Sequence, residues 1–226
     1  LGVLNGMVCV ANMIEMGQIR AGLIVAGENG GPLVDTTIET LLAEPDLTRR
    51  EVKTSFASLT IASAAAGVLL AHRDLSQSRP RLLGGAGQAA TEFNDLCRGN
   101  DDTASGRESW SPLMNTDAET MMHEGCKLAG ETWELTRKVL NWENEDVSRV
   151  FCHQVGQMHR KLLYKTLGLD LEKDFSTLEF LGNTGAASLP SALALGAEEG
   201  RITSGDKVAL LGIGSGLNCL MLGIEW

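Results

Sequence analysis

Apolar positions in the first third of the chain change from a helical period to short continuous runs. Over residues 1–16 they recur at steps of three and four, and Gly17 follows, which predicts a buried helix that ends at this glycine. Residues 21–28 form an apolar run without alternation, which is typical of a strand covered on both faces. Residues 29–60 mix polar and apolar positions, so we expect an excursion with one short helix near Val34–Leu42, a candidate lid.

The middle of the chain contains two further apolar runs and then its most polar segment. We expect strands at residues 64–72 and 81–88. Arg98–Ser111 is rich in turn-forming and charged residues, which favours a surface excursion between two halves. The chain is thereby divided into the remainder of an N-terminal half (1–97, with the excursion 29–60), a polar connecting loop (98–116) and a C-terminal half (117–226).

The C-terminal half begins with a capping box. Thr116 is the expected N-cap, and Glu119 stands three positions on, ahead of an amphipathic helix of about 24 residues. The elements expected after it are a strand at 149–152, a helix at 157–167 stopped by Gly168, a strand at 175–181, a turn at 182–185, a helix at 186–199 and strands at 207–213 and 218–226. The order of elements resembles that of residues 1–72, so we predict an α/β fold of two similar layered halves, of which the N-terminal half is incomplete.

Charge and cysteine content exclude several classes of protein. The 226 residues carry 19 Lys and Arg against 29 Asp and Glu, a net charge of −10, which repels nucleic acid. Five scattered cysteines without CxxC spacing argue against a disulfide scaffold or a zinc site. No apolar stretch is long enough to span a membrane, and we expect a cytoplasmic protein. Because the helical pattern starts directly at Leu1 without a capping residue, we also expect further protein upstream of it.

Three segments place polar or glycine residues at the ends of apolar strands, where an α/β fold opens on a crevice. They contain His153, Asn183 and the glycine run 212–216. Each also has a purely structural explanation: a histidine that ends a strand, an asparagine that forms a turn, and a tight hairpin between two buried strands. The residues alone leave both interpretations open.

Two other candidates are weaker. Gly85–Ala90 fits the loose GxGxxA form of a dinucleotide site, but no helix or well-placed acidic residue is expected after it. Cys9 lies two turns into the first helix and is expected to be buried or to face a neighbour, where a thiol is inert. Cys152 precedes His153 in a strand, so the two side chains point to opposite faces. Neither cysteine is a good candidate nucleophile.

Read in order, FCHQVGQMHR, LGNTGAASLP and LLGIGSGLNCLMLGIEW resemble the C-terminal half of the thiolase-fold condensing enzymes. Within this superfamily they are similar to the ketoacyl-ACP synthase III group and most of all to the OleA enzymes, which join two fatty acyl-CoA chains head to head. The opening segment LGVLNGMVCVANMIEMGQIRAGLIVAGE resembles the part of the family that follows its nucleophilic cysteine. His153-Gln154-Val155-Gly156 replaces the His-Gln-Ala-Asn of ketoacyl-ACP synthase III, which favours the OleA branch.

The resemblance implies a thiolase-like fold and a catalytic role for three residues. A cysteine directly before Leu1 would be the nucleophile, His153 and Asn183 would stabilise an enolate, and the N–H of Gly216 would help to form an oxyanion hole. It also implies fatty acyl-CoA substrates, no cofactor, and a homodimer in which the partner supplies a glutamate base from a segment upstream. The implied reaction is a condensation without loss of CO₂, the first step of long-chain olefin synthesis. Two alternatives stay open: decarboxylative condensation with malonyl-ACP, and a catalytically silent subunit.

Overall fold

The computed structural model describes the chain in five stretches: 1–44, 46–77, 80–99, 113–153 and 155–226. The α-helices in these stretches are α1 (Gly2–Glu15), α2 (Gly31–Ala43), α3 (Arg49–Ser55), α4 (Ala118–Leu140), α5 (Gln157–Leu167), α6 (Leu178–Leu181) and α7 (Ser188–Glu198). The strands are β1 (Ala21–Glu28), β2 (Ala64–Ala71), β3 (Arg81–Ala89), β4 (Cys97–Gly99), β5 (Met114–Thr116), β6 (Arg149–Cys152), β7 (Lys207–Gly214) and β8 (Asn218–Glu225). None of the described helices is long and apolar enough to cross a membrane.

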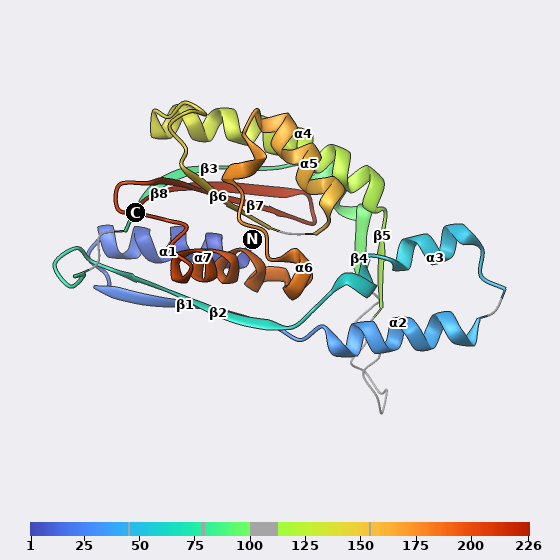
Figure 1. Cartoon of the computed structure of the whole chain (residues 1–226). Coiled ribbons are helices and arrows are strands. Elements are labelled where there is room, and N and C mark those ends of the chain that lie inside the picture. Colours follow the sequence, from blue (N-terminus) through green and yellow to red (C-terminus); the bar gives the residue numbers. More distant parts are fainter. Residues whose placement is uncertain (45, 78–79, 100–112, 154) are drawn as a thin grey trace.

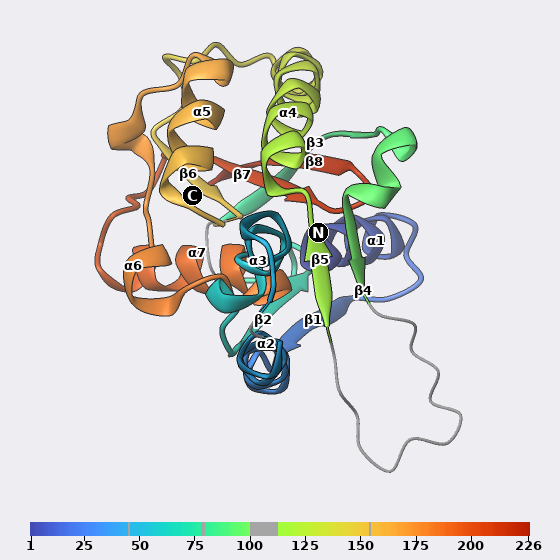
Figure 2. The same cartoon turned by 90° about the vertical axis from the view of Figure 1, so that its right-hand side faces the viewer.

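The elements stack in four layers (Figure 1). Helices α4 and α5 cover one face of a sheet of order β3-β8-β7-β6, α1 and α7 cover its other face, and the antiparallel pair β1-β2 lies beyond α1 and α7. Helices α2 and α3 extend to one side of these layers, the side that faces the viewer in Figure 2. The predicted α/β fold of stacked layers is confirmed.

Strands β6, β7 and β8 of the four-stranded sheet are buried on both faces and alternate between two cores, whereas the edge strand β3 is partly exposed. In β6 and β7, Val150 and Leu211 point toward the core under α4 and α5, whereas Phe151 and Leu210 point toward the core around α1 and α7. All four side chains are fully buried. Because both faces are apolar, the strands appear in the sequence as continuous apolar runs, as predicted for β7.

The two-stranded sheet differs, because only one of its faces is covered. Ile24 is buried against α1, close enough that a Cβ on Gly6 would lie 2.8 Å from its Cγ2. Leu23, Val25 and Leu69 point the other way and are 64%, 71% and 68% exposed. The prediction of a strand at 21–28 is confirmed, but the prediction that both its faces are covered is wrong for the described residues. Among the elements that the structure describes, the α1 and α7 layer is the one that lies against this sheet.

Most predicted elements are present within a residue or two of their expected ends. The helix near Val34–Leu42 is confirmed and is longer than expected, while α3 and the 3-10 turn η1 (Ser58–Thr60) were not predicted. That the excursion 29–60 is a lid stays a prediction. The segment Arg98–Ser111 lies almost wholly outside the described residues. Strand β3 precedes this segment yet pairs with β8, so one sheet contains strands from both sides of it; the division at 98–116 stays a prediction.

The predicted strand at 175–181 is wrong. Its first residue does approach β6, since the Phe175 N–H donates to the Val150 carbonyl at 3.3 Å. The chain then turns into α6, a single helical turn that ends at Gly182, whose φ is +69°. Glycine adopts this left-handed conformation without steric cost, and its presence allows the chain to reverse here instead of continuing as a strand.

The start of α4 also differs from the prediction by one residue. The N-cap is Asp117, whose carboxylate accepts from the Thr120 N–H at 3.1 Å. Thr116 is instead the last residue of β5 and is buried. Glu119, the expected partner in the capping box, forms an ion pair with Lys53 of α3 at 2.8 Å. Aspartate is as good an N-cap as threonine, so the helix begins normally.

Candidate active site

A cavity of about 680 Å³ opens where α1 begins, β6 ends and β7 turns into β8. The end of β3 and the 3-10 turn η4 (Gly185–Ala187) complete its wall. The residues that line it are Leu1, Asn5, Gly87, Gln88, Ala89, His153, Gly185, Ala186, Ile213, Gly214, Ser215, Asn218, Cys219 and Leu220. This cavity therefore joins the start of the first helix to the strand ends at which the sequence predicts functional residues.

His153 lines this cavity as the first residue after β6. Its backbone N–H donates to the Leu211 carbonyl of β7 at 3.0 Å, which fixes the main chain at the edge of the covered sheet. Burial lowers the pKa of the imidazole to about 4, and the nearby His159 acts in the same direction. The side chain is therefore neutral at physiological pH, with one N–H to donate and one lone pair to accept.

Asn183 lies in the turn that leads from α6 into η4. Its N–H donates to the Thr60 carbonyl at 3.0 Å, and its own carbonyl accepts from the Ala62 N–H at 2.8 Å. Its side-chain Oδ1 accepts from the Gly185 N–H at 3.1 Å, so the residue does form a turn. Within the described stretches Nδ2 has no hydrogen-bond partner. Asn183 does not itself line the cavity, whereas Gly185 and Ala186, which follow it, do.

Gly216 lies at the turn between β7 and β8, with a φ of +125°. The backbone requires glycine at this φ, and a Cβ here would lie 2.5 Å from Nδ2 of Asn218, whose side chain would have to move. Its neighbours Ser215 and Asn218 line the cavity, although Gly216 does not. No acceptor in the described part of the chain takes its N–H. The predicted roles of His153, Asn183 and Gly216 stay predictions, with the first in the cavity wall and the others beside it.

The N-terminus of α1 brings positive potential to the cavity. Leu1 is the N-cap and contributes no side-chain hydrogen bond, and the first turn contains no acidic residue. The first N–H groups of a helix lack partners within it, and they carry the positive end of the helix dipole. An anion or thiolate at this end of the cavity would be stabilised, and the pKa of a thiol placed there would be lowered.

The thiols of the described residues are not in this position. Cys152 is buried with Sγ 3.7 Å from Oδ1 of Asp174, and burial raises its pKa well above that of a free thiol. Burial also raises the pKa of Cys126 to about 11 and that of Cys219 to about 12. Cys9 is exposed, so its expected burial is wrong. It lies on the face of α1 opposite to Met7, which is buried.

The dinucleotide alternative is contradicted by the structure. Gly85–Ala89 belongs to β3 and not to a turn between a strand and a helix. A Cβ on Gly85 would lie 1.9 Å from the Met221 carbonyl oxygen, so this glycine serves the close approach of two strands. In the stretches that the structure describes, no three His, Cys, Asp or Glu residues are grouped as a metal site would require.

Three polar residues at or near the cavity were not singled out from the sequence. Asn5 and Gln88 line it from α1 and β3. Glu28, the last residue of β1, accepts from the Ala186 N–H at 2.8 Å through Oε1. Glu28 has the same sequence feature that indicates His153 as a candidate: it is a polar residue directly at the end of an apolar strand.

The chain matches known proteins along its whole length. The family described as "3-Oxoacyl-[acyl-carrier-protein (ACP)] synthase III C terminal" matches residues 138–226. The chain is 42% identical to the acyl-CoA:acyl-CoA alkyltransferase of Shewanella oneidensis and 38% identical to that of Xanthomonas campestris. All of this chain is covered in both cases, and it spans 65% and 64% of the length of these relatives.

Solved structures agree. A cysteine-to-alanine variant of Xanthomonas campestris OleA superposes with a TM-score of 0.91 at 38% identity, over all of this chain and 62% of that one. The 3-oxoacyl-ACP synthase III of Xanthomonas oryzae gives 0.90 at 38% identity, over 64% of its chain. Other solved OleA structures carry substitutions at a glutamate and at a histidine. The chain therefore belongs to the thiolase-fold condensing enzymes, in the group that contains ketoacyl-ACP synthase III and OleA.

Proposed function

We propose that the whole protein is an acyltransferase that condenses two fatty acyl-CoA molecules to a β-ketoacyl product without loss of CO₂, the first step of long-chain olefin synthesis. The observation that carries this proposal is the cavity shared by the N-terminus of α1 and His153. Relatives named acyl-CoA:acyl-CoA alkyltransferase support the substrate class. The proposal includes a cysteine directly before Leu1, a cytoplasmic location and a homodimer. A mass measurement in solution tests the homodimer.

The first step transfers one acyl group to the enzyme. The cysteine thiolate attacks the thioester carbonyl, a C–S bond forms, and the bond to CoA breaks to release the CoA thiolate, which takes up a proton. The N-terminal end of α1 stabilises the attacking thiolate. The N–H of Gly216 and the N–H of the cysteine hold the oxyanion of the tetrahedral intermediate.

The second step forms the carbon–carbon bond. A carboxylate base, a glutamate of the partner subunit in the family's pattern, removes a proton from the α-carbon of the second acyl-CoA. His153 and Asn183 donate hydrogen bonds to the resulting enolate oxygen, and the α-carbon attacks the acyl-enzyme carbonyl. The bond to cysteine breaks and the thiolate is restored. Because His153 is neutral, it stabilises the enolate as a hydrogen-bond donor without adding a formal charge.

The test is to incubate the whole protein with a long-chain acyl-CoA and to measure CoA release together with the β-keto product. His153→Ala should lower condensation by about 10²- to 10³-fold, the usual effect of removing a donor to a developing oxyanion. Unchanged turnover in His153→Ala would remove this residue from the mechanism.

A second candidate function is decarboxylative condensation with malonyl-ACP, which the match to the ketoacyl-ACP synthase III family favours. It is distinguished by the release of one CO₂ for each product. A third candidate, a catalytically silent subunit that shapes the pocket of a partner, predicts that no cysteine precedes Leu1 in the whole protein.

A further inference from the structure

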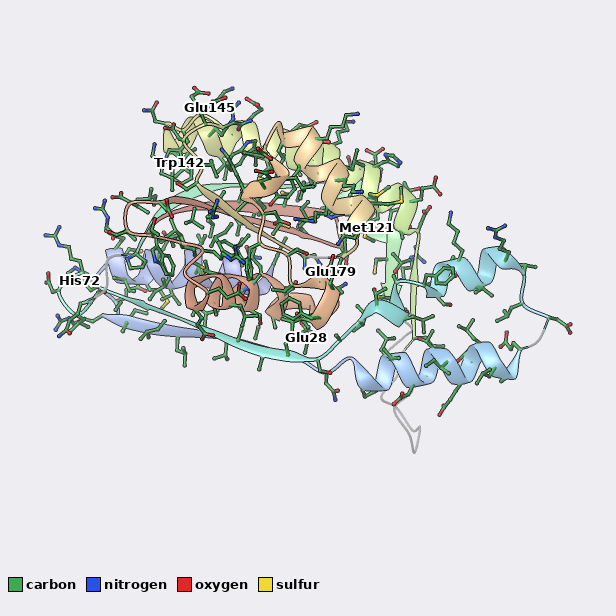
Figure 3. The ribbon with its side chains drawn as sticks, in the orientation of Figure 1. Glu28, His72, Met121, Trp142, Glu145 and Glu179 are labelled. Atoms are coloured by element: carbon green, nitrogen blue, oxygen red, sulfur yellow. The ribbon has the colours of Figure 1, made fainter. Side chains whose placement is uncertain are left out.

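Glu28 makes a long-range contact that the proposed mechanism does not use. It lies at the end of β1, beneath α6 and α7 in Figure 3, and its Oε1 accepts from the Ala186 N–H at 2.8 Å across 158 residues of sequence. The carboxyl group of Glu28 also packs tightly against Gly185, since a Cβ on Gly185 would lie 2.6 Å from Cδ of Glu28. Gly185 also has a φ of +52°, so glycine is needed here both for the backbone and for the carboxylate.

The contact completes the set of hydrogen bonds that holds the Asn183 turn. The N–H of Gly185 is taken by the side chain of Asn183, and the next N–H, that of Ala186, is taken by Glu28. The main chain of Asn183 is paired with Thr60 and Ala62. Every one of the long-range partners, Glu28 included, comes from residues 28–62, and none comes from the sheet that holds His153.

We propose that Glu28 is a positioning residue for the condensation step: by holding Ala186, it fixes the turn that directs the carboxamide of Asn183. This inference rests on the proposed function, in which Asn183 acts only after the acyl-enzyme has formed. A hydrogen bond between a carboxylate and a backbone N–H is stronger than a neutral one, so its loss frees a turn that contains two glycines. A displacement of about 1 Å in a reacting geometry lowers rates by about 10²-fold.

A different role for Glu28 has to be separated from this one. Its carboxylate accepts from the N–H of Ala186, and Ala186 lines the same cavity as Leu1, so its negative charge lies beside the cavity into which the N-terminus of α1 opens. A role in tuning that helix end depends on the charge, whereas positioning depends on the hydrogen bond to Ala186. Glu28→Gln removes the charge and keeps an oxygen that accepts, and Glu28→Ala removes both.

The experiment uses the whole protein with a long-chain acyl-CoA. Rapid quenching measures the initial burst of CoA that reports acyl-enzyme formation, and steady-state assays measure the kcat and KM for the β-keto product. Glu28→Ala should keep the burst within about twofold, lower condensation by about 10- to 100-fold and leave KM within about threefold. Glu28→Gln and the control Glu145→Ala, an exposed residue far from the site (Figure 3), should condense at nearly the wild-type rate.

Three results would overturn the proposal: full condensation activity in Glu28→Ala, an equal loss in Glu28→Gln, or a loss of the burst together with condensation. Hydrogen exchange of the peptide that contains residues 183–187 provides a measure that does not depend on activity. This exchange should be faster in Glu28→Ala than in Glu28→Gln. Equal exchange rates would contradict the proposal that the hydrogen bond between Glu28 and Ala186 holds the turn. If the wild-type protein forms neither burst nor product, the proposed function fails. The exchange rates still show whether the hydrogen bond between Glu28 and Ala186 holds the turn.

Discussion

Two units of the chain have the same element order but different surroundings. In α7-β7-β8, residues Val208–Ile213 of the first strand are all buried, because α4 and α5 cover one face of the sheet and α1 and α7 the other. In α1-β1-β2, the first strand alternates, and Leu23 and Val25 on its outer face are exposed. Similar apolar runs thus lie in a fully covered sheet in one unit and in a sheet covered on one side in the other.

The candidate site is divided between these two regions. His153 is fixed through its main chain to Leu211 in the covered sheet. Asn183 is fixed by Thr60 and Ala62, which shortly precede β2, and through Ala186 by Glu28 at the end of β1. We therefore expect substitutions in the covered sheet to destabilise the whole fold, and substitutions around the Asn183 turn to affect chemistry more than stability.

The largest effect is expected in the covered sheet. Leu210 of β7 is completely buried, and Leu210→Ala should lower the free energy of unfolding by about 2–5 kcal/mol through lost burial and the cavity left behind. Urea denaturation of the whole protein measures this change. Val139→Ala, at a position 62% exposed on α4, is the control and should change stability by less than about 0.5 kcal/mol. Equal costs for the two variants would contradict the dependence of stability on burial in the covered sheet.

The second effect is a pH dependence carried by His153. Its pKa is about 4 in the folded protein, against about 6.5 when unfolded. The unfolded chain binds more protons between these values, so this contribution to stability is fully present above pH 6.5 and is lost as the pH falls toward 4. His153→Gln should reduce the difference in unfolding free energy between pH 7 and pH 4 by roughly 2–3 kcal/mol.

Denaturation series at both pH values, with the exposed His123→Gln as control, test this prediction. If the difference in unfolding free energy between pH 7 and pH 4 is unchanged in His153→Gln, the imidazole is not held neutral by burial.

The third effect separates chemistry from stability at the Asn183 turn. Gly185→Ala places a Cβ 2.6 Å from the carboxyl carbon of Glu28, on a residue whose φ is +52°. The Glu28 side chain must then move, and its hydrogen bond to the Ala186 N–H is disturbed. Condensation should fall by about 10- to 100-fold while the CoA burst is kept. Gly200→Ala is a matched control, since Gly200 has a φ of +69° but no atom within 4 Å of the added Cβ. Both variants carry backbone strain of about 1–2 kcal/mol, but only Gly185→Ala should lose condensation.

Local signals predicted the elements well where one residue determines an end. Gly17 and Gly168 end α1 and α5 as expected, and the apolar runs of β6, β7 and β8 lie within a residue or two of their predicted ends. The prediction failed at 175–181, because the helical turn there depends on the left-handed Gly182 and not on the preceding apolar residues. The outer face of β1 also differs from the prediction in the part of the chain that the structure describes, because an apolar run does not reveal which residues will cover it.

The candidate site shows a similar limit. His153 was predicted from its place at a strand end, and the cavity includes it. The role of Glu28 was not predicted, because its partner Ala186 lies 158 residues away and no local pattern joins the two. The sequence offers turn formation and catalysis as alternative interpretations of Asn183. In the structure Oδ1 forms the turn, and Nδ2 has no hydrogen-bond partner in the described stretches. One carboxamide therefore has the capacity for both roles.

The smallest effect is expected at an exposed ion pair between α3 and α4. Lys53 of α3 and Glu119 of α4 form an ion pair at 2.8 Å, but their side chains are 63% and 65% exposed. Solvent screens such a pair, and holding two long side chains together costs conformational entropy. Lys53→Met should therefore leave both the melting temperature and condensation within error of the wild type, as should the exposed control Lys127→Met. A clear loss of condensation in Lys53→Met alone would show that α3 is positioned by this charge and that the excursion 29–60 acts on the site.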